Sequence, residues 1–331
     1  MTGAHDQRRQ LKNAFHAHQF GWLDIVIWGS ALAAWFLFPT YLTLGTYVLI
    51  MILFALSLNL AVGYGGIETL GHAAFFGTGS YAAALYALHV SEEPLSGLFV
   101  AGAAAGILGL ISGIFILRTR GLALVMLTLA IASMLHEFAI TAKVITGGDD
   151  GLSGYRLSPI LGMFRFDLAG KTGYLYCLAV LALAFLYSRV LTNSPFGLTA
   201  AGIRENPLRT RLLGIPTARR TVLLYAQSAI LAGLAGGLSA QIVRIASVDS
   251  LSFVMSGNVL IMSVLGGVNR LYGAFLGATL YVVFSDRAAA IDPYNWLLAT
   301  GILLILVVRY MPDGLMGFIE TRILKSRGEP K

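Results

Sequence analysis

Residues 41–81 read YLTLGTYVLIMILFALSLNLAV (41–62) followed by GYGGIETLGHAAFFGTGSY (63–81). The first part is a predominantly apolar run of about 20 residues, the length that a helix needs to cross a lipid bilayer. The second part places six glycines among aromatic residues where the next apolar run begins. Because glycine weakens helices, we expect the backbone to break between the two helices. Such a break is tolerated at membrane depth only against protein or a water-filled cavity.

The composition indicates an integral membrane protein. Of the 331 residues, 57% are hydrophobic and only 12% are charged, with a mean hydropathy of +0.76, whereas a soluble domain carries about 25% charged residues. The net charge of +7 comes mostly from bases in short loops, which indicates topology rather than nucleic-acid binding. The one cysteine, Cys177, lies in an apolar run and is expected to be a buried hydrophobe. The first 20 residues are polar, so no cleavable signal peptide is expected.

Ten apolar segments predict an all-α polytopic bundle of about ten transmembrane helices. Their approximate bounds are 22–38, 41–62, 70–88, 96–116, 121–140, 173–191, 221–240, 253–268, 272–288 and 296–311. Several are shorter than about 20 residues, so some are expected to be tilted, broken or re-entrant.

The basic residues of the loops predict the orientation. With ten crossings, one side receives Arg8, Arg9, Lys12, Arg118, Arg120, Arg204, Arg209, Arg211, Arg219, Arg220, Arg270, Arg322, Lys325, Arg327 and Lys331. The other side receives Glu92, Glu93, Asp149, Asp150, Asp249 and Asp292, together with the fewer bases Lys143, Arg156, Arg165, Lys171 and Arg244. The excess of bases marks the cytoplasmic side, so both termini are predicted to be cytoplasmic.

The predicted organisation is therefore one transmembrane domain over 21–317 between cytoplasmic tails at 1–20 and 318–331. A periplasmic loop is expected at 141–172 and a cytoplasmic loop at 192–220. The chain contains 38 glycines, and runs such as 101–106 and 233–237 favour close helix packing. That packing fits either a bundle that repacks during transport or a static one. Residues 266–275 are weakly similar in sequence to residues 65–75, which fits either an internal repeat or chance.

Motifs for catalysis are absent from the sequence. It has no phosphate-binding loop, no His-Glu-x-x-His pair and no Gly-x-Ser-x-Gly elbow. The ionisable residues inside the apolar segments lie mostly near segment ends: Asp24, His72, His136, Glu137, Arg189, Asp286, Arg287 and Arg309. We therefore predict no catalytic residues, no metal site, no cofactor and no enzymatic activity in this chain.

The stretch 59–81 resembles the permease subunits of bacterial ABC importers for branched-chain amino acids. The shared residues are Asn59, Gly63, Tyr64, Gly66, Leu70, Gly71, His72, Ala73, Ala74, Phe75, Phe76, Gly77, Gly79 and Tyr81, with Thr69 in place of a serine. Two positions depart from the pattern: Ile67 replaces a glutamine, and Glu68 stands where the family is apolar. Candidate substrate-pathway residues are Asn59, Gly65, Gly66, Glu68, Thr69, Gly71, His72, Phe75 and Gly77. The spacing alone also fits a tight helix hairpin without ligand contact.

The segment 194–215 resembles the loop through which this family's permeases dock on their ATPase subunits. Its residues also predict a short helix, with Asn206 as the cap, Pro207 at the first position and Gly214 at the end. The candidate coupling residues are Ala201, Arg204, Glu205, Asn206, Leu208, Leu212 and Gly214. An amphipathic helix lying on lipid headgroups is the alternative.

Three further motifs continue the resemblance in family order. They are Thr146–Leu152, Met262–Ala274, with Asn269 where the family has glycine, and Met311–Gly317. The resemblance implies half of a translocation pathway in the bacterial inner membrane. The implied partners are a second homologous permease, two cytoplasmic ATPases that bind the ATP, a periplasmic solute-binding protein and membrane lipid, without nucleic acid.

The solute stays open at this stage. Branched-chain or other hydrophobic amino acids are expected, with urea, short amides or aromatic acids as the alternative, and the sequence does not decide between a homodimer and a heterodimer. A stand-alone ion-coupled carrier would bury several acidic residues at mid-depth, and a membrane enzyme would need a catalytic constellation. The sequence has few acidic residues in its apolar segments and no catalytic constellation, so both alternatives are disfavoured.

Overall fold

A computed structural model describes residues 22–37, 39–119, 121–160, 162, 164, 170–311 and 313–318. Its elements are α2 (Trp22–Leu37), η1 (Pro39–Tyr41), α3 (Leu42–Leu58), η2 (Asn59–Tyr64), α4 (Ala73–His89), α5 (Pro94–Ile116), α6 (Leu122–Thr141), α7 (Lys143–Thr146), η3 (Gly148–Asp150), β1 (Leu152–Ser153), α8 (Lys171–Asn193), α9 (Pro195–Glu205), α10 (Pro207–Leu212), α11 (Thr217–Val243), β2 (Ile245–Ala246), η4 (Val248–Leu251), α12 (Phe253–Gly266), α13 (Leu271–Ile291) and α14 (Trp296–Tyr310). The predicted tails, 1–20 and all but the first residue of 318–331, lie outside the described residues.

The structure confirms an all-α bundle of membrane-spanning length. Within the described ranges, seven helices are long and apolar enough to cross a membrane: Pro39–Tyr64, Pro94–Ile116, Leu122–Thr141, Lys171–Asn193, Thr217–Val243, Leu271–Ile291 and Trp296–Phe318. The other three predicted segments correspond to the shorter helices α2, α4 and α12. Because α12 has 14 residues, it is about 21 Å long, less than the roughly 30 Å of a bilayer's hydrocarbon core. The ten crossings and their orientation stay predictions.

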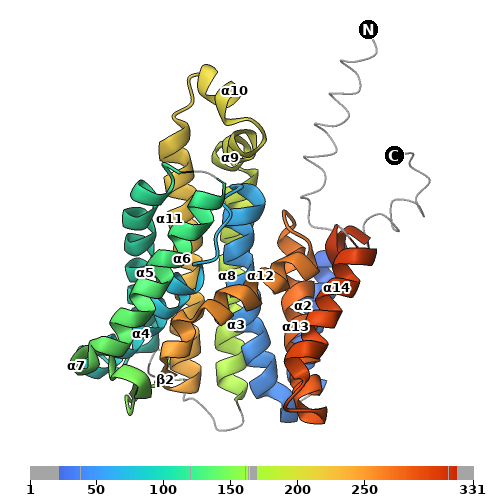
Figure 1. Cartoon of the computed structure of the whole chain (residues 1–331). Helices are drawn as coiled ribbons and strands as arrows, with labels where there is room; N and C mark the ends of the chain where they lie inside the picture. The colour runs from blue at the N-terminus through green and yellow to red at the C-terminus, as the bar shows by residue number, and fades with distance from the viewer. Residues whose placement is uncertain are drawn as a thin grey trace.

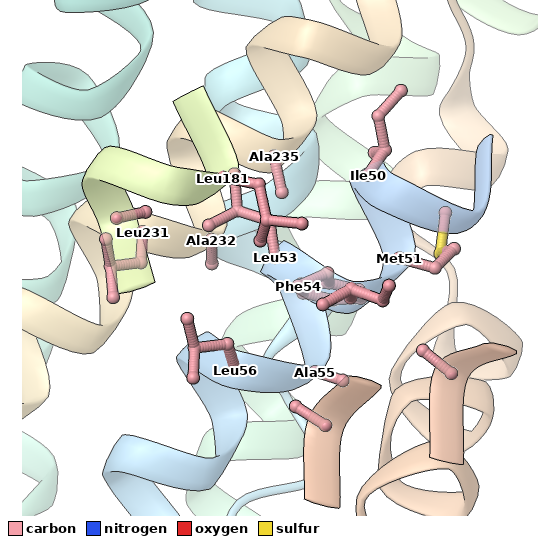
Figure 2. Close-up of a cluster of buried hydrophobic side chains, with 14 of the residues drawn as sticks. Ile50, Met51, Leu53, Phe54, Ala55, Leu56, Leu181, Leu231, Ala232 and Ala235 are labelled. Atoms are coloured by element: carbon pink, nitrogen blue, oxygen red, sulfur yellow. The ribbon is translucent and has the colours of Figure 1, made fainter. Parts of the chain in front are cut away.

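Helix α3 forms the centre of the bundle. Its sequence is apolar on every side, and a helix of this kind is stable only when it is surrounded. Leu53, Phe54 and Leu56 are fully buried, and Figure 2 shows Leu181 of α8 and Leu231 of α11 among the side chains around them. By contrast, only 22% of the α6 span and 18% of the span that contains α14 are buried. These two helices therefore lie at the periphery.

Helices α4, α5 and α11 pack through small residues, as the glycine content predicted. A Cβ added to Gly79 would lie 2.2 Å from the carbonyl oxygen of Gly233, and one added to Gly236 would lie 1.8 Å from that of Phe76. On the other side of α11, a Cβ at Gly106 would lie 2.6 Å from the side chain of Ile230. Larger residues would force these backbones apart, so glycine sets the spacing of the three helices.

The two ends of the bundle differ. Helices α9 and α10 project beyond one end, close to the connection between α5 and α6, whereas α7 and the strands lie at the other (Figure 1). There β1 pairs antiparallel with β2, with Leu152 opposite Ala246. The strands and α7 lie in or beside the region that the sequence indicated only as a loop over 141–172. The turns that join α7, η3 and β1 use Gly147, Gly148 and Gly151, which take positive φ values of 77°, 65° and 68° that glycine adopts without strain.

Candidate functional site

The predicted break in the backbone is present. Helix α3 passes directly into the π-helical turn η2, the chain then leaves helical geometry, and α4 begins only at Ala73. We call residues 65–72 the glycine break. Short π-helical segments inside α-helices occur often at functional sites. The first turn of α4 meets the first turn of α12, where the amide of Ala73 donates to Ser256 Oγ at 3.0 Å.

Asn59 ties η2 to the turn that precedes α13. Its Nδ2 donates to the carbonyl oxygen of Arg270 at 2.7 Å, and its Oδ1 accepts from the amide of Asn269 at 2.8 Å. Asn269 has a φ of 74°, a conformation that asparagine tolerates better than most residues other than glycine. This φ explains physically how asparagine can stand where the resembling family has glycine.

The turn that holds Asn269 also anchors the last motif of the chain. A Cβ added to Gly314, which has a φ of 71°, would lie 2.4 Å from Gly267. The motif at 262–274 and the closing motif at 311–317 are therefore packed against one another, and the first of them contacts Asn59.

His72 is a packed residue of the interior. It is fully buried, its Nε2 lies 2.9 Å from Ser57 Oγ, and its ring stacks on Phe54 with centroids 5.6 Å apart. Its neighbour Gly71 lies so close to α6 that a Cβ there would be 2.1 Å from the carbonyl oxygen of Thr128. These contacts hold the start of α4 in place.

The candidate pathway residues divide into two groups by exposure. The buried ones are Asn59, Gly65, Thr69, Gly71, His72, Phe75 and Gly77, and the exposed ones are Gly66 and Glu68. Ile67, which replaces the family's glutamine, is only 2% exposed and belongs to the core. Glu68 is therefore the one candidate pathway residue with a side chain that lies exposed on the surface of the described chain. The pathway role of all nine residues stays a prediction.

The short helix predicted between the cap Asn206 and Gly214 is present as α10, which spans Pro207–Leu212. The side chain of Asn206 accepts from the amide of Arg209 at 2.9 Å, and Gly214 follows the helix with a φ of 81°. Helix α9 was not predicted, although Ser194-Pro195 repeats the cap-and-proline pattern of Asn206-Pro207. The Ser194 side chain caps α9 by accepting from the amide of Gly197 at 3.3 Å.

The tip of this loop presents apolar side chains to the outside. Leu208 is 69% exposed and Leu212 is 81% exposed. Ala201 is half-buried, whereas Glu205 and Asn206 are exposed beside them. Exposed leucines on a short helix outside the bundle are suited to contact with a protein partner or a lipid surface.

Arg204 connects the projecting loop to the glycine break. Its Nη1 donates to the carbonyl oxygen of Gly63 in η2, and its aliphatic stem lies over Gly66, where an added Cβ would be 2.7 Å from Arg204 Cγ. Gly66 has a φ of 63°, so glycine is required there both by conformation and by space. This contact joins residues 141 positions apart, and sequence spacing held no signal of it.

The described helices have membrane-spanning length, and the non-helical connection between α3 and α4 packs mostly in the interior and contacts an external loop. Irregular backbone of this kind often lines the site of a multi-pass membrane transport protein. The family described as the permease component of branched-chain amino acid transport systems matches residues 40–308. The chain belongs to this family and is a transmembrane permease.

Individual relatives agree with the family. The chain is 27% identical over 310 residues to the high-affinity branched-chain amino acid transport system permease protein LivM of Escherichia coli (strain K12). This match covers 87% of this chain and 72% of the relative. It is 26% identical over 309 residues to a probable LivM of Methanocaldococcus jannaschii, covering 79% of this chain and 89% of the relative. It is also 25% identical over 229 residues to the galactose/methyl galactoside import permease protein MglC of Salmonella typhimurium, covering 63% and 65%. No solved structure matches the chain significantly.

Proposed function

We propose that this chain is one of two permease subunits of an ABC importer that carries branched-chain or other hydrophobic amino acids across the bacterial inner membrane. A second homologous permease completes the pathway, a periplasmic binding protein delivers the solute, and two cytoplasmic ATPases supply the energy. The family membership supports this role. Two of the relatives are named as permeases for branched-chain amino acids.

In this proposal, the end with α9 and α10 faces the cytoplasm and the end with α7 faces the periplasm. The gathering of bases in the loops supports this orientation, because Arg204, Arg209, Arg211, Arg219 and Arg220 all lie in or next to the projecting loop, whereas Asp149 and Asp150 lie in η3 after α7. The positive-inside rule relates such a difference to the cytoplasmic side.

The observation that carries the proposed mechanism is the contact of Arg204 with η2. When the ATPases bind and hydrolyse ATP, they displace the α9–α10 loop. Arg204, hydrogen-bonded to Gly63 and packed on Gly66, passes this displacement to the glycine break. Residues 66–69 of the break lie outside regular helix, and Gly66 and Glu68 are exposed, so in this proposal it is this part of the break that changes conformation. The pathway then opens toward the cytoplasm.

The docking surface can be tested by Leu212→Asp in the assembled transporter. Because Leu212 is 81% exposed, the change leaves the fold intact, but a carboxylate at the centre of an apolar contact should prevent ATPase co-purification and abolish uptake. Val144→Asp is the matched control, since Val144 is fully exposed in α7 at the opposite end. Normal ATPase binding by the Leu212 variant would contradict docking and favour contact with lipid headgroups.

The solute can be identified in proteoliposomes that contain both permeases, the ATPases and the binding protein. We expect ATP-dependent accumulation of leucine, isoleucine or valine. Accumulation of urea, short amides or aromatic acids in their place would refute this solute class. Accumulation in vesicles without the ATPases but with a proton gradient would establish the carrier alternative.

Glu68 gives the proposal a residue-level test. Its carboxylate is exposed on the glycine break, where it can attract the ammonium group of an amino acid. Glu68→Gln should therefore change the rate or the order of preference among amino-acid solutes. The matched control is Glu137→Gln, which removes the same charge from an exposed position of α6. An unchanged uptake profile in the Glu68 variant would show that Glu68 lies outside the pathway.

A further inference from the structure

A cavity of about 640 Å³ lies beneath the projecting loop. Three parts of the chain form its walls: the glycine break at Gly65–Ile67, the connection between α5 and α6 at 117–124, and the segment from Ile203 to Thr221. Its volume is in the range of small-molecule sites. The transport mechanism proposed above assigns no ligand to it.

The charged side chains that line this cavity, which we call the basic cavity, are all positive. Arg204, Arg211 and Arg219 line it, and no aspartate or glutamate does so among the described lining residues. The ion pair found among the described residues joins Arg189 to Asp24. None of the three arginines of the cavity therefore has a carboxylate partner among those residues. Three guanidinium groups around one space repel each other, and an anion with several oxygen atoms would relieve that repulsion.

The apolar part of the wall lies where two membrane spans end. Leu117 directly follows the span Pro94–Ile116, and Leu124 lies in the first turn of the span Leu122–Thr141. Ile203 and Ile215 add apolar surface on the side of the loop. A ligand in the cavity thus meets arginines on one side and, on the other, apolar side chains at the level where the hydrocarbon region begins.

We propose that the basic cavity is a binding site for a phosphate group, contributed by an anionic phospholipid headgroup or by a free phosphate. The planar guanidinium group matches phosphate oxygens in pairs. Basic cavities between transmembrane helices on the cytoplasmic side are suited to anionic headgroups. The apolar residues at the ends of the α5 and α6 spans favour the lipid source, because they can contact the first carbons of its acyl chains.

The occupant would hold the projecting loop to the rest of the bundle. Arg211 belongs to α10, Arg219 to the first turn of α11, and Arg204 contacts the glycine break. A phosphate shared by these residues connects all three elements.

The test measures the unfolding midpoint of the purified full chain in neutral detergent. Dioleoyl phosphatidylglycerol, dioleoyl phosphatidylcholine or inorganic phosphate is added at constant ionic strength. Phosphatidylglycerol should raise the midpoint in a saturable manner and phosphatidylcholine should not. In the double variant Arg211→Ala/Arg219→Ala, the apparent affinity should fall by about tenfold or more. The matched control Lys143→Ala/Arg156→Ala removes two cations from the opposite end and should keep the response.

A second variant tests the site without removing any arginine. Ala218→Glu puts a carboxylate on an exposed lining residue in the first turn of α11, where an acid suits the helix dipole. It should abolish the response, whereas Ala218→Gln should keep it.

The arms of the experiment distinguish the sources. A response to inorganic phosphate that both the arginine double variant and Ala218→Glu abolish would support the site with free phosphate as its source. An equal phosphatidylglycerol response in the arginine double variant and in the Lys143/Arg156 control would overturn the proposal. So would an arginine double variant that keeps the lipid response but loses ATPase co-purification, because the cavity would then be a contact for an acidic segment of that partner.

Discussion

The close approach of α4 and α11 at Gly236 leads to a quantitative prediction. In the wild-type chain, a Cβ at this position would lie 1.8 Å from the carbonyl oxygen of Phe76 and 3.0 Å from the amide nitrogen of Ser80. Ordinary van der Waals contact begins near 3.4 Å, so Gly236→Ala forces the two backbones apart by about 1.6 Å. Neither neighbour is a flexible side chain that could move aside.

The expected cost is about 3 kcal/mol of unfolding free energy, at the upper end of the usual range for overpacking because backbone atoms must move. Gly301→Ala in α14 is the matched control, since an added Cβ there meets nothing within 4 Å and alanine favours the helix by about 1 kcal/mol. The two changes therefore have opposite signs.

The assay is thermal unfolding of the purified variants in one detergent, followed by intrinsic fluorescence and by the fraction that remains monodisperse. The Gly236 variant should melt roughly 5–10 °C below wild type, and the Gly301 variant at or slightly above it. Equal midpoints for Gly236→Ala and wild type would refute the reasoning, because they would mean that α4 and α11 do not approach at this spacing.

Three further predictions concern single contacts. Asp24→Asn removes the carboxylate that Arg189 Nη1 contacts at 3.2 Å in the interior. The change should lower the unfolding free energy by about 3–5 kcal/mol. The double variant Asp24→Asn/Arg189→Met should recover most of this loss. Asn269→Gly should change the unfolding midpoint little, because glycine adopts a φ of 74° and keeps the amide donor, whereas Asn269→Val should lower it clearly. The hydrogen bond from the Asn295 side chain, together with backbone amides, lowers the pKa of Asp292, so the turn between α13 and α14 should be most stable above about pH 4. That stability should be lost as the pH falls through the lowered pKa. Amide hydrogen exchange in the turn should show this dependence in wild type and lose it in Asp292→Ala.

Much of the bundle could be predicted from local sequence because lipid makes strong local demands. An apolar run must be helical in a bilayer, where every backbone group needs an internal partner, so the positions of the spans followed from hydropathy. The end of α3 and the start of α4 were indicated by the glycines between them. The helix α10 was predictable because Asn206, Pro207 and Gly214 each act within a few residues of themselves.

Short apolar helices were harder to interpret from sequence. Segment 253–268 has the hydropathy of a span, but α12 ends at Gly266 after 14 residues, because glycine in a left-handed conformation follows it at Gly267. The strand pair β1–β2 joins segments about 90 residues apart in the chain, and two residues are too few to produce an alternating pattern.

Hydropathy already indicated a multi-pass membrane protein and the positions of its long helices, and five motifs in order along the chain indicated its family. Each of these conclusions rests on interactions between residues close together in the sequence, or on the order of the motifs along the chain. Three features became visible only in the folded chain: Ile67 is buried while Glu68 is exposed, Asn59 holds the turn at Asn269, and Arg204 contacts the glycine break. These contacts join residues up to 211 positions apart, and such pairings depend on how whole helices pack, which no local pattern encodes.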